Sequence, residues 1–278
     1  MPVLTECETN ATSDVLELSS TDGTVDDFLA LVASARQSAL LLDFDGTLAP
    51  FRIDPAKVRP WAGVTALLGD IQQAGPTRIA IISGRPAKDV ALQLGMPSPP
   101  EIWGLHGAER MTPDGHVEID NLHPQHRAAL NAAKLSLQTA DTTGLRLEEK
   151  WNAIAIHWRG KSEHFTRIAR ERMSALLSPF GNEAGMKLLQ FDGGIELRAG
   201  RDKGDAVRML LAEMPSEAPV AFMGDDITDE DAFRALKGRG LGILARRDWR
   251  PTLAQVWLRP PLQLRGFLAA WLRALQSQ

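Results

Sequence analysis

The stretch LLLDFDGTLAP, from Leu40 to Pro50, limits the fold more than any other part of this 278-residue chain. An unbroken apolar run stops abruptly at Asp43, which is typical of a short parallel strand buried on both faces. Asp43 and Asp45 flank one apolar residue before Gly46 allows a sharp turn. Open α/β sheets bind ligands outside the carboxyl ends of their strands, so we expect a site here.

The pattern of an apolar run followed by a helix repeats along the chain. Runs at RIAIIS, EIWGL and APVAFMG are typical of further buried strands, and helical periodicity separates them. This alternation predicts an α/β fold with a doubly wound parallel sheet. Between Met111 and Phe191 the rhythm changes, and two helices with several short strands predict an inserted α/β unit. We therefore expect a flexible tail at 1–25, a core domain at 26–110 and 192–278, and an inserted cap domain at 111–191.

Composition narrows the class of partner. The formal net charge is −4 with no long Lys/Arg run, which removes the electrostatic attraction that nucleic-acid binding needs. We expect a small-molecule partner instead. No apolar run approaches the roughly 18 residues of a membrane span, and the N-terminus is polar, so we expect no signal peptide or anchor. The single cysteine, Cys7, favours a reducing, cytoplasmic compartment. The oligomeric state stays open.

The paired aspartates suit phosphoryl transfer. Asp43 can attack phosphorus directly and form an aspartyl-phosphate. Asp45 can protonate the leaving alkoxide and then deprotonate the attacking water. Backbone N–H groups at Gly46 can cradle phosphate oxygens. The alternative is an Asp-Gly turn without function, which we weigh less because D-x-D-G-T rarely arises by chance in a chain of this length.

Three further signals follow apolar runs or open helices. Taken alone, Ser83 in SGR is more simply a turn residue, and Lys203 at the start of a helix is more simply a surface lysine. In GDDITDED the carboxylates crowd one turn, among them Asp225, Asp226 and Asp229. Part of this charge stabilises a helix N-terminus, but so many carboxylates repel unless a cation joins them. Hard oxygen ligands favour Mg²⁺.

Taken in order, DFDGT, SGR, Lys203 and GDDITDE resemble the four motifs of haloacid dehalogenase-type phosphatases. The resemblance implies a Rossmann-like parallel-sheet core with an inserted α/β cap. It also implies that Asp43 is the nucleophile and Asp45 the general acid and base, with Lys203 as a third catalytic residue. The implied groups are Mg²⁺ ligands at Asp43, the Asp45 carbonyl and Asp225, surrounding carboxylates at Asp226 and Asp229, and phosphate contacts at Thr47, Ser83 and Lys203.

A narrower resemblance is to the trehalose-6-phosphate phosphatase family. It rests on GLHGAER from Gly104, on EEKWNAIAIHWR from Glu148, and on Glu196 ahead of Lys203. It implies hydrolysis of trehalose 6-phosphate to trehalose, with the cap closing over the disaccharide. The substrate-binding candidates are Arg85, His106, Gly107, Glu109, Glu148, Lys150, His157, Arg159 and Glu196.

These candidates are not equal. Glu148, Lys150 and Glu196 are the stronger sugar contacts, whereas His157 and Arg159 lie in an alternating strand and serve a structural salt bridge equally well. Where that family carries a small residue after the cap lysine, this chain has Trp151, so we expect a narrowed or reshaped sugar pocket. The segment between Glu196 and Lys203 is also shorter than we expect for that family, and it lacks the proline that is usual there.

Three alternative functions stay open. The first is a phosphatase for another sugar phosphate, such as sucrose phosphate, glucosylglycerate phosphate or mannosylglycerate phosphate. The second is a receiver-type signalling module, which is much shorter and has no inserted cap. The third is an inactive sugar-phosphate sensor, against which the presence of both Asp43 and Asp45 argues.

Overall fold

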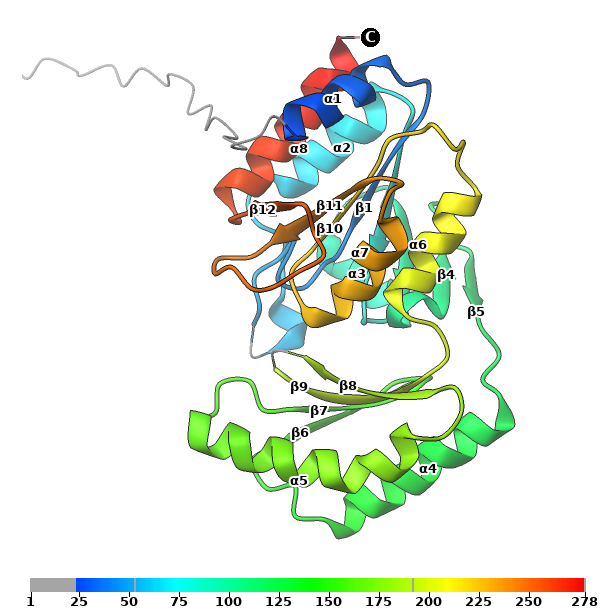
Figure 1. Cartoon of the computed structure of the whole chain (residues 1–278), viewed down its shortest axis with the longest axis vertical. Coiled ribbons are helices and arrows are strands. Elements are labelled where there is room, and N and C mark those ends of the chain that lie inside the picture. Colours follow the sequence, from blue (N-terminus) through cyan, green and yellow to red (C-terminus); the bar gives the residue numbers. More distant parts are fainter. Residues whose placement is uncertain (1–23, 53, 192, 278) are drawn as a thin grey trace, which may run out of the picture.

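A computed structural model of the protein describes residues 24–52, 54–191 and 193–277. Over these residues the strands form one eight-stranded and one four-stranded sheet, which follow one another along the long axis (Figure 1). Most of the segment expected to be a flexible tail, together with Cys7, lies outside the described residues. None of the described helices combines the length and the apolar character that crossing a bilayer requires.

The larger sheet has the order β12-β11-β10-β1-β2-β3-β4-β5, and its first six strands are parallel. The bounds are β1 (Ser38–Leu42), β2 (Thr77–Ile82), β3 (Glu101–Gly104), β4 (Glu109–Met111), β5 (Val117–Ile119), β10 (Val220–Gly224), β11 (Leu241–Ala245) and β12 (Val256–Leu258). Every residue of β1 is buried, because β1 lies between β10 and β2 and helices cover both faces. The predicted Rossmann-like parallel core is confirmed.

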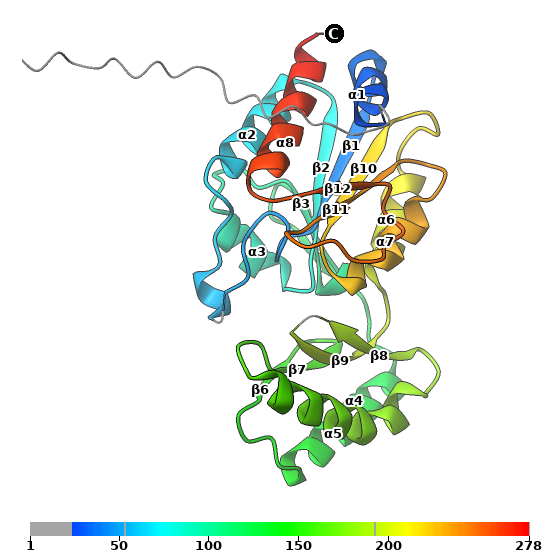
Figure 2. The same ribbon diagram turned by 60° about the vertical axis from the view of Figure 1, so that its left-hand side comes forward.

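Alternate residues of β1 face two separate apolar cores. Leu40 and Leu42 pack with the helices on one face, and Ala39 and Leu41 pack with those on the other. Figure 2 shows α2, α3 and α8 on one side of the sheet and α6 and α7 on the other. The helices are α1 (Thr24–Ser34), α2 (Val64–Ala74), α3 (Ala87–Leu94), α6 (Lys203–Ala212), α7 (Glu230–Leu236) and α8 (Leu262–Gln276). Short 3-10 turns are η1 (Pro55–Lys57), η2 (Leu105–Gly107) and η3 (Ile227–Asp229).

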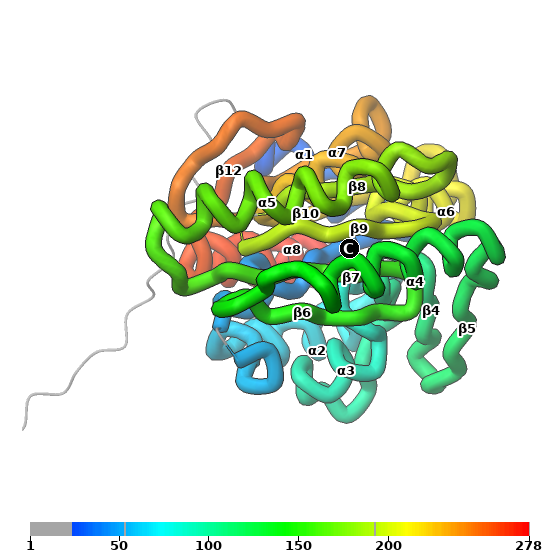
Figure 3. Tube along the Cα trace, turned by 90° about the horizontal axis from the view of Figure 1, so that it is seen from below, coloured from blue at the N-terminus to red at the C-terminus, as the bar shows by residue number. Residues whose placement is uncertain are grey.

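The smaller sheet is antiparallel, with the order β6-β7-β9-β8. It consists of β6 (Arg146–Glu149), β7 (Ala153–His157), β8 (Met186–Phe191) and β9 (Gly194–Ala199), backed by α4 (Pro124–Thr139) and α5 (Glu163–Gly181). Ile154, Ile156 and Leu197 pack in the apolar core that these helices share with the sheet. Both helices cover the face turned away from the larger sheet (Figures 1 and 3). The other face is therefore turned towards the carboxyl ends of β1 and β10.

The two sheets divide the chain at other residues than the expected bounds of 111 and 191. β5 pairs with β4 and continues the larger sheet, because the turn around Gly115 forms a hairpin. β9 pairs with β7 and β8 and belongs to the smaller sheet. Glu196 lies on β9, so it is part of the smaller sheet and not, as the expected bounds implied, of the core. A division into a core domain and a cap domain stays a prediction.

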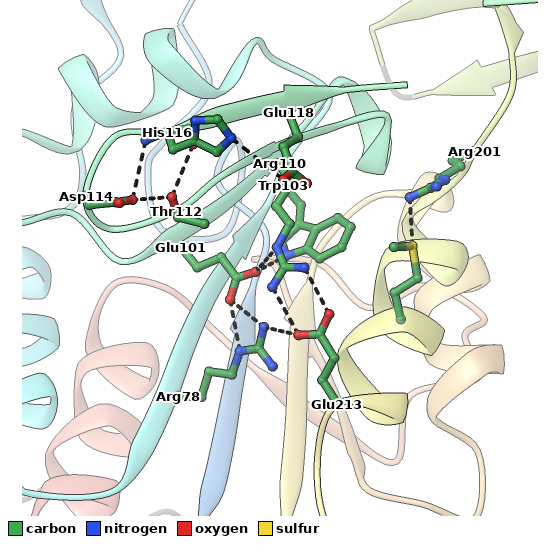
Figure 4. Close-up of polar contacts among 11 residues, drawn as sticks. Arg78, Glu101, Trp103, Arg110, Thr112, Asp114, His116, Glu118, Arg201 and Glu213 are labelled. Atoms are coloured by element: carbon green, nitrogen blue, oxygen red, sulfur yellow. Dashed lines mark hydrogen bonds and ion pairs between the residues drawn. The ribbon is translucent and has the colours of Figure 1, made fainter. Parts of the chain in front are cut away.

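A charged network joins β2, β3 and β4 of the larger sheet to Glu213, the residue that follows α6. The carboxylate of Glu101 accepts from Arg78 at 2.7 Å and from Arg110 at 2.7 Å, and both guanidinium groups also contact Glu213 (Figure 4). Trp103 donates its indole N–H to Glu101 at 3.0 Å, and Arg110 lies 4.9 Å over the same indole. Only 8% of the Glu101 side chain is exposed, so hydrogen bonds from these donors replace the water contacts that its carboxylate loses.

We expect Glu101→Gln to lower the free energy of unfolding by about 2–3 kcal/mol, below the roughly 3–5 kcal/mol of fully buried pairs because both arginines are partly hydrated. The matched change Glu213→Gln, at a carboxylate that is 38% exposed, should stay within roughly 1 kcal/mol. Urea unfolding of the three proteins measures the difference. Equal losses would contradict the central place of Glu101.

Candidate active site

The carboxyl ends of the central strands gather the predicted residues at one edge of the larger sheet. Asp43 follows β1, Ser83 follows β2, Asp225 follows β10, and Lys203 opens α6. They lie at or beside a cavity of about 400 Å³ that separates this edge from the smaller sheet. That volume is within the roughly 300–1,000 Å³ of small-molecule sites. The structure thus brings these predicted residues together at one cavity.

Asp43 is buried against an ammonium group. Lys203 Nζ lies 2.6 Å from Asp43 Oδ1, and the Thr47 hydroxyl is 3.4 Å from Oδ2. Burial nevertheless raises the pKa of Asp43 to about 7, because desolvation outweighs the Lys203 charge. Burial acts to lower the pKa of Lys203, but the charges of Asp229 and Asp43 outweigh it and raise that pKa. Lys203 is therefore a fixed positive charge beside a candidate nucleophile.

Three buried carboxylates form a group that could hold a cation. Asp43, Asp225 and Asp229 each offer an oxygen, and these oxygens lie within 4.8 Å of one another. Burial and the charges of neighbouring carboxylates raise the pKa of Asp225 well above its usual value. When all three are ionised, three carboxylates beside the ammonium of Lys203 leave two negative charges, which a divalent cation would balance. Hard oxygen donors suit Mg²⁺ or Ca²⁺, so the residues present fit such an ion.

Asp229 has the most complete set of partners in this group. Its Oδ2 accepts from the backbone N–H groups of Asp225 and Asp226 at 2.9 Å each, and its Oδ1 accepts from Lys203 at 2.7 Å. Asp229 therefore orients the loop that carries Asp225. Gly46 has φ +91°, and a Cβ there would lie 2.2 Å from Asp225 Oδ2, so only glycine permits this close approach.

Asp45 and Ser83 are oriented by the same residue. Arg85 donates from Nε and Nη2 to the two oxygens of Asp45, at 2.5 and 2.6 Å. The Arg85 backbone N–H donates to Ser83 Oγ at 3.2 Å. Since that oxygen already accepts a hydrogen bond, the Ser83 hydroxyl hydrogen is available to a phosphoryl oxygen in the cavity.

The smaller sheet supplies the opposite wall. Alternation along its strands brings Arg146, Glu148, His157, Leu189 and Phe191 to one face, all lining the cavity. Their neighbours across the sheet on this face include Ala155 and Gly194, whose small size leaves room above the acidic edge.

Two side-chain contacts hold this wall in place. His157 Nε2 lies 2.7 Å from Glu148 Oε2, and this contact is the main reason that the pKa of Glu148 falls to about 2. Lys150 Nζ donates to Glu196 Oε2 at 2.7 Å. Glu196 is almost fully buried, and although burial acts to raise its pKa, the Lys150 charge and its other partners hold that pKa well below its usual range. The acceptors of Glu196 are therefore already engaged within the protein.

His106 joins the core to this wall. Its Nε2 lies 3.2 Å from Glu196 Oε1, and burial lowers the pKa of His106 to about 3, so the contact is a hydrogen bond from a neutral ring. The backbone of His106 has φ 58°, and a Cβ on Gly84 would lie 2.6 Å from its ring. Arg159 bridges the two parts at another point, where its guanidinium lies 3.8 Å over the Phe51 ring.

The structure gives some expected substrate residues other contacts. Glu109 accepts from the backbone N–H of Ala87 at 2.7 Å and thus holds the start of α3. Gly107 packs against α6, where an added Cβ would lie 3.0 Å from the Ala206 Cβ. These two residues lie outside the cavity lining, whereas Arg85, His106, Glu148, Lys150, His157, Arg159 and Glu196 line it.

The expectation that Trp151 narrows the pocket is wrong. Its indole N–H donates to the Asp120 carbonyl at 3.1 Å, and Arg127 lies 4.9 Å over its ring. Trp151 is 40% exposed and packs on the segment that leads into α4, away from the cavity. Trp151 lies in the turn between β6 and β7, where its contacts with Asp120 and Arg127 hold the side chain on that segment.

Several lining residues escaped the sequence analysis, among them Phe51, Arg146, Leu189 and Phe191. Leu189 and Phe191 were detectable in principle, since they alternate along MKLLQF on the face opposite the apolar core. Phe51 comes from the loop after the first aspartates, and nothing local in its sequence marks it as a contact across the cavity.

A family profile and curated relatives point to the same family for this chain. The trehalose-phosphatase family profile matches residues 41–248. A trehalose-phosphate phosphatase of Mycobacterium marinum is 34% identical over 244 residues, which cover 82% of this chain and 60% of that protein. The Mycobacterium tuberculosis protein of the same name is 32% identical over 265 residues, covering 87% and 63%. This chain thus spans about three fifths of the length of the curated relatives it matches.

The fold is also found among solved structures. The C-terminal domain of a trehalose-6-phosphate phosphatase from C. albicans superposes with a TM-score of 0.74 at 20% identity, covering 91% of this chain and 96% of that domain. A similarity at this level of identity supports the fold alone.

The raised pKa of Asp43 gives a pH-dependent stability. In EDTA the folded protein keeps a proton on Asp43 that the unfolded chain releases between about pH 4 and pH 7, so stability falls as the pH rises through this window. Asp43→Asn removes that titration. The free energy of unfolding of the wild type, relative to Asp43→Asn, should therefore be lower at about pH 8 than at about pH 5.

Chemical denaturation at both pH values measures this difference. The exposed Asp54 serves as the matched control, and Asp54→Asn should show a much smaller change between the two conditions. If the free energies of unfolding of the wild type and Asp43→Asn instead differ by the same amount at both pH values, that result would show that Asp43 is not held protonated in the cation-free protein.

Proposed function

Because this chain belongs to the trehalose-phosphatase family, we propose that it is a Mg²⁺-dependent phosphatase that converts trehalose 6-phosphate to trehalose and phosphate. The observation that carries the proposal is the buried Asp43 carboxylate, 2.6 Å from Lys203 and at the floor of the cavity. A carboxylate in that position is available to phosphorus, and the fixed ammonium beside it favours a phosphoryl group.

In the first step an Asp43 oxygen forms a bond to phosphorus while the bond from phosphorus to the sugar oxygen breaks. Asp45 gives its proton to the leaving oxygen, so that trehalose departs as a neutral alcohol. Lys203 and the Ser83 hydroxyl stabilise the charge on the phosphoryl oxygens. A bound Mg²⁺, held by Asp43, the Asp45 carbonyl and Asp225, would neutralise further charge on the phosphoryl group.

In the second step a water oxygen attacks phosphorus and the bond to Asp43 breaks. Asp45 takes the proton from that water, which returns both aspartates to their starting state and releases inorganic phosphate. Asp226 and Asp229 support this step by fixing the loop that carries Asp225, since Asp229 accepts from two of its backbone N–H groups.

The residues of the smaller sheet account for the choice of sugar in this proposal. We infer that this sheet with α4 and α5 is a cap domain that closes over the larger sheet. A neutral disaccharide offers only hydroxyl groups, so carboxylate and ammonium groups must read it. Glu148 and Lys150 line the cavity and suit that task, and Glu196 supports it by holding Lys150 at 2.7 Å.

The activity is tested by phosphate release from a panel of sugar phosphates, including trehalose 6-phosphate and sucrose phosphate. We expect the fastest release from trehalose 6-phosphate, with activity lost in EDTA and restored by Mg²⁺ better than by Ca²⁺, because in-line transfer suits a small octahedral ion. Asp43→Asn should abolish turnover in a folded protein. A preference for another sugar phosphate, or activity in EDTA, would contradict the proposal.

The sugar contacts are tested by Glu148→Ala and Lys150→Ala. Each should lower kcat/KM for trehalose 6-phosphate by roughly 10- to 1,000-fold, the scale of one or two charge-assisted hydrogen bonds. Hydrolysis of 4-nitrophenyl phosphate, which has no sugar, should change little.

The chain supplies a matched control between these two residues. Glu149 lies on the opposite face of β6, where it pairs with Lys134 at 2.7 Å. Glu149→Ala should leave both substrates unaffected. Equal losses on both substrates for the Glu148 or Lys150 variants would mean that these residues support the fold and do not read the sugar.

A further inference from the structure

Arg85 is fixed at both ends. Its backbone N–H donates to Ser83 Oγ, and its backbone carbonyl accepts from the N–H of Leu105 at 2.9 Å. Its guanidinium Nη1 donates to the Pro55 carbonyl at 2.9 Å. Only 16% of the side chain is exposed. The guanidinium is therefore a rigid group and not a flexible surface charge.

The part of Arg85 that faces the cavity is directed at Asp45. Nε and Nη2 each donate to a different oxygen of that carboxylate, at 2.5 and 2.6 Å. A bidentate pair fixes the rotation of the carboxylate as well as its position. Three of the five N–H groups of Arg85 are thus committed to protein acceptors, which argues against the sugar contact expected from the sequence.

We propose that Arg85 is a positioning residue, which aligns the Asp45 carboxylate to take the proton from the attacking water when the Asp43 aspartyl-phosphate is hydrolysed. The inference rests on the proposed function and adds a residue to its second step. Water then bonds to phosphorus, its proton goes to Asp45, and the bond from phosphorus to Asp43 breaks. A bidentate guanidinium contact suits this step because it fixes both the position and the direction of the Asp45 oxygens.

The two half-reactions can be separated with 4-nitrophenyl phosphate. Nitrophenolate leaves without a proton, so the first step needs no acid, and the second step still needs the base. Arg85→Ala should therefore lower the steady-state rate by roughly 10- to 100-fold while the rate constant of the initial burst stays within about threefold of wild type. The burst amplitude should approach one nitrophenolate per enzyme, measured by stopped flow with Mg²⁺ present.

A second variant and a control keep the result clear. Arg85→Lys retains a charge but cannot form the bidentate pair, so we expect it to lose most of the same steady-state rate even if Arg85→Ala folds poorly. Arg59 donates to the carbonyls of Ala56 and Val58 in the neighbouring loop, and Arg59→Ala should leave both phases unchanged.

A double-mutant cycle tests the link to Asp45 itself. If Arg85 acts through Asp45, Arg85→Ala should have almost no further effect on the steady-state rate in an Asp45→Asn background. Additive losses would overturn the proposal, as would a burst slowed as much as the steady state. The proposal would also be overturned if Arg85→Ala raised the KM for trehalose 6-phosphate but left the kinetics on 4-nitrophenyl phosphate unchanged. If the wild-type protein hydrolysed 4-nitrophenyl phosphate but no trehalose 6-phosphate, the proposed substrate would be refuted, and the role of Arg85 could still be tested on the aryl phosphate.

Discussion

The acidic edge of the larger sheet depends on one buried ammonium group. Lys203 lies 2.6 Å from Asp43 and 2.7 Å from Asp229, so its ammonium group directly contacts two of the three buried carboxylates. Desolvation still raises the pKa of Asp43 to about 7, so the compensation is incomplete. This remaining negative charge makes the site suitable for a divalent cation. The same arrangement explains why Gly46 must leave room for Asp225.

The wall opposite this edge follows a different principle. Its side chains belong to one face of a four-stranded antiparallel sheet, whose other face packs on α4 and α5. Alternation along the strands therefore gives this sheet an apolar face, which packs on the helices, and a face with most of the charged side chains, which lines the cavity. Contacts between side chains, such as Glu148 with His157 and Lys150 with Glu196, fix the positions of the charged groups on the cavity face. Each pair fixes the geometry of its carboxylate before any substrate arrives, which reduces the entropy lost on binding.

Contacts between the two parts of the molecule come from segments far apart in the chain. His106 reaches Glu196 from the turn after β3, and Arg159 lies over Phe51 from the end of β7. Both join the larger sheet to the smaller one beside the cavity. The strained backbone of His106 is part of this arrangement, since its positive φ directs the ring past Gly84. These two contacts therefore help to hold the two walls of the cavity together.

The sequence by itself determined the parallel core, because the buried run before Asp43 and its repeats leave few other folds, and it identified the acidic residues at the strand ends. Local pattern was sufficient there, since a strand end and its loop are neighbours in sequence. Only the tertiary structure decided that Glu196 belongs to the smaller sheet, that Trp151 points away from the cavity and that Glu109 holds α3. It also decided that Arg85 meets Asp45. These outcomes depend on strand pairing and on contacts between distant segments, which no local periodicity encodes.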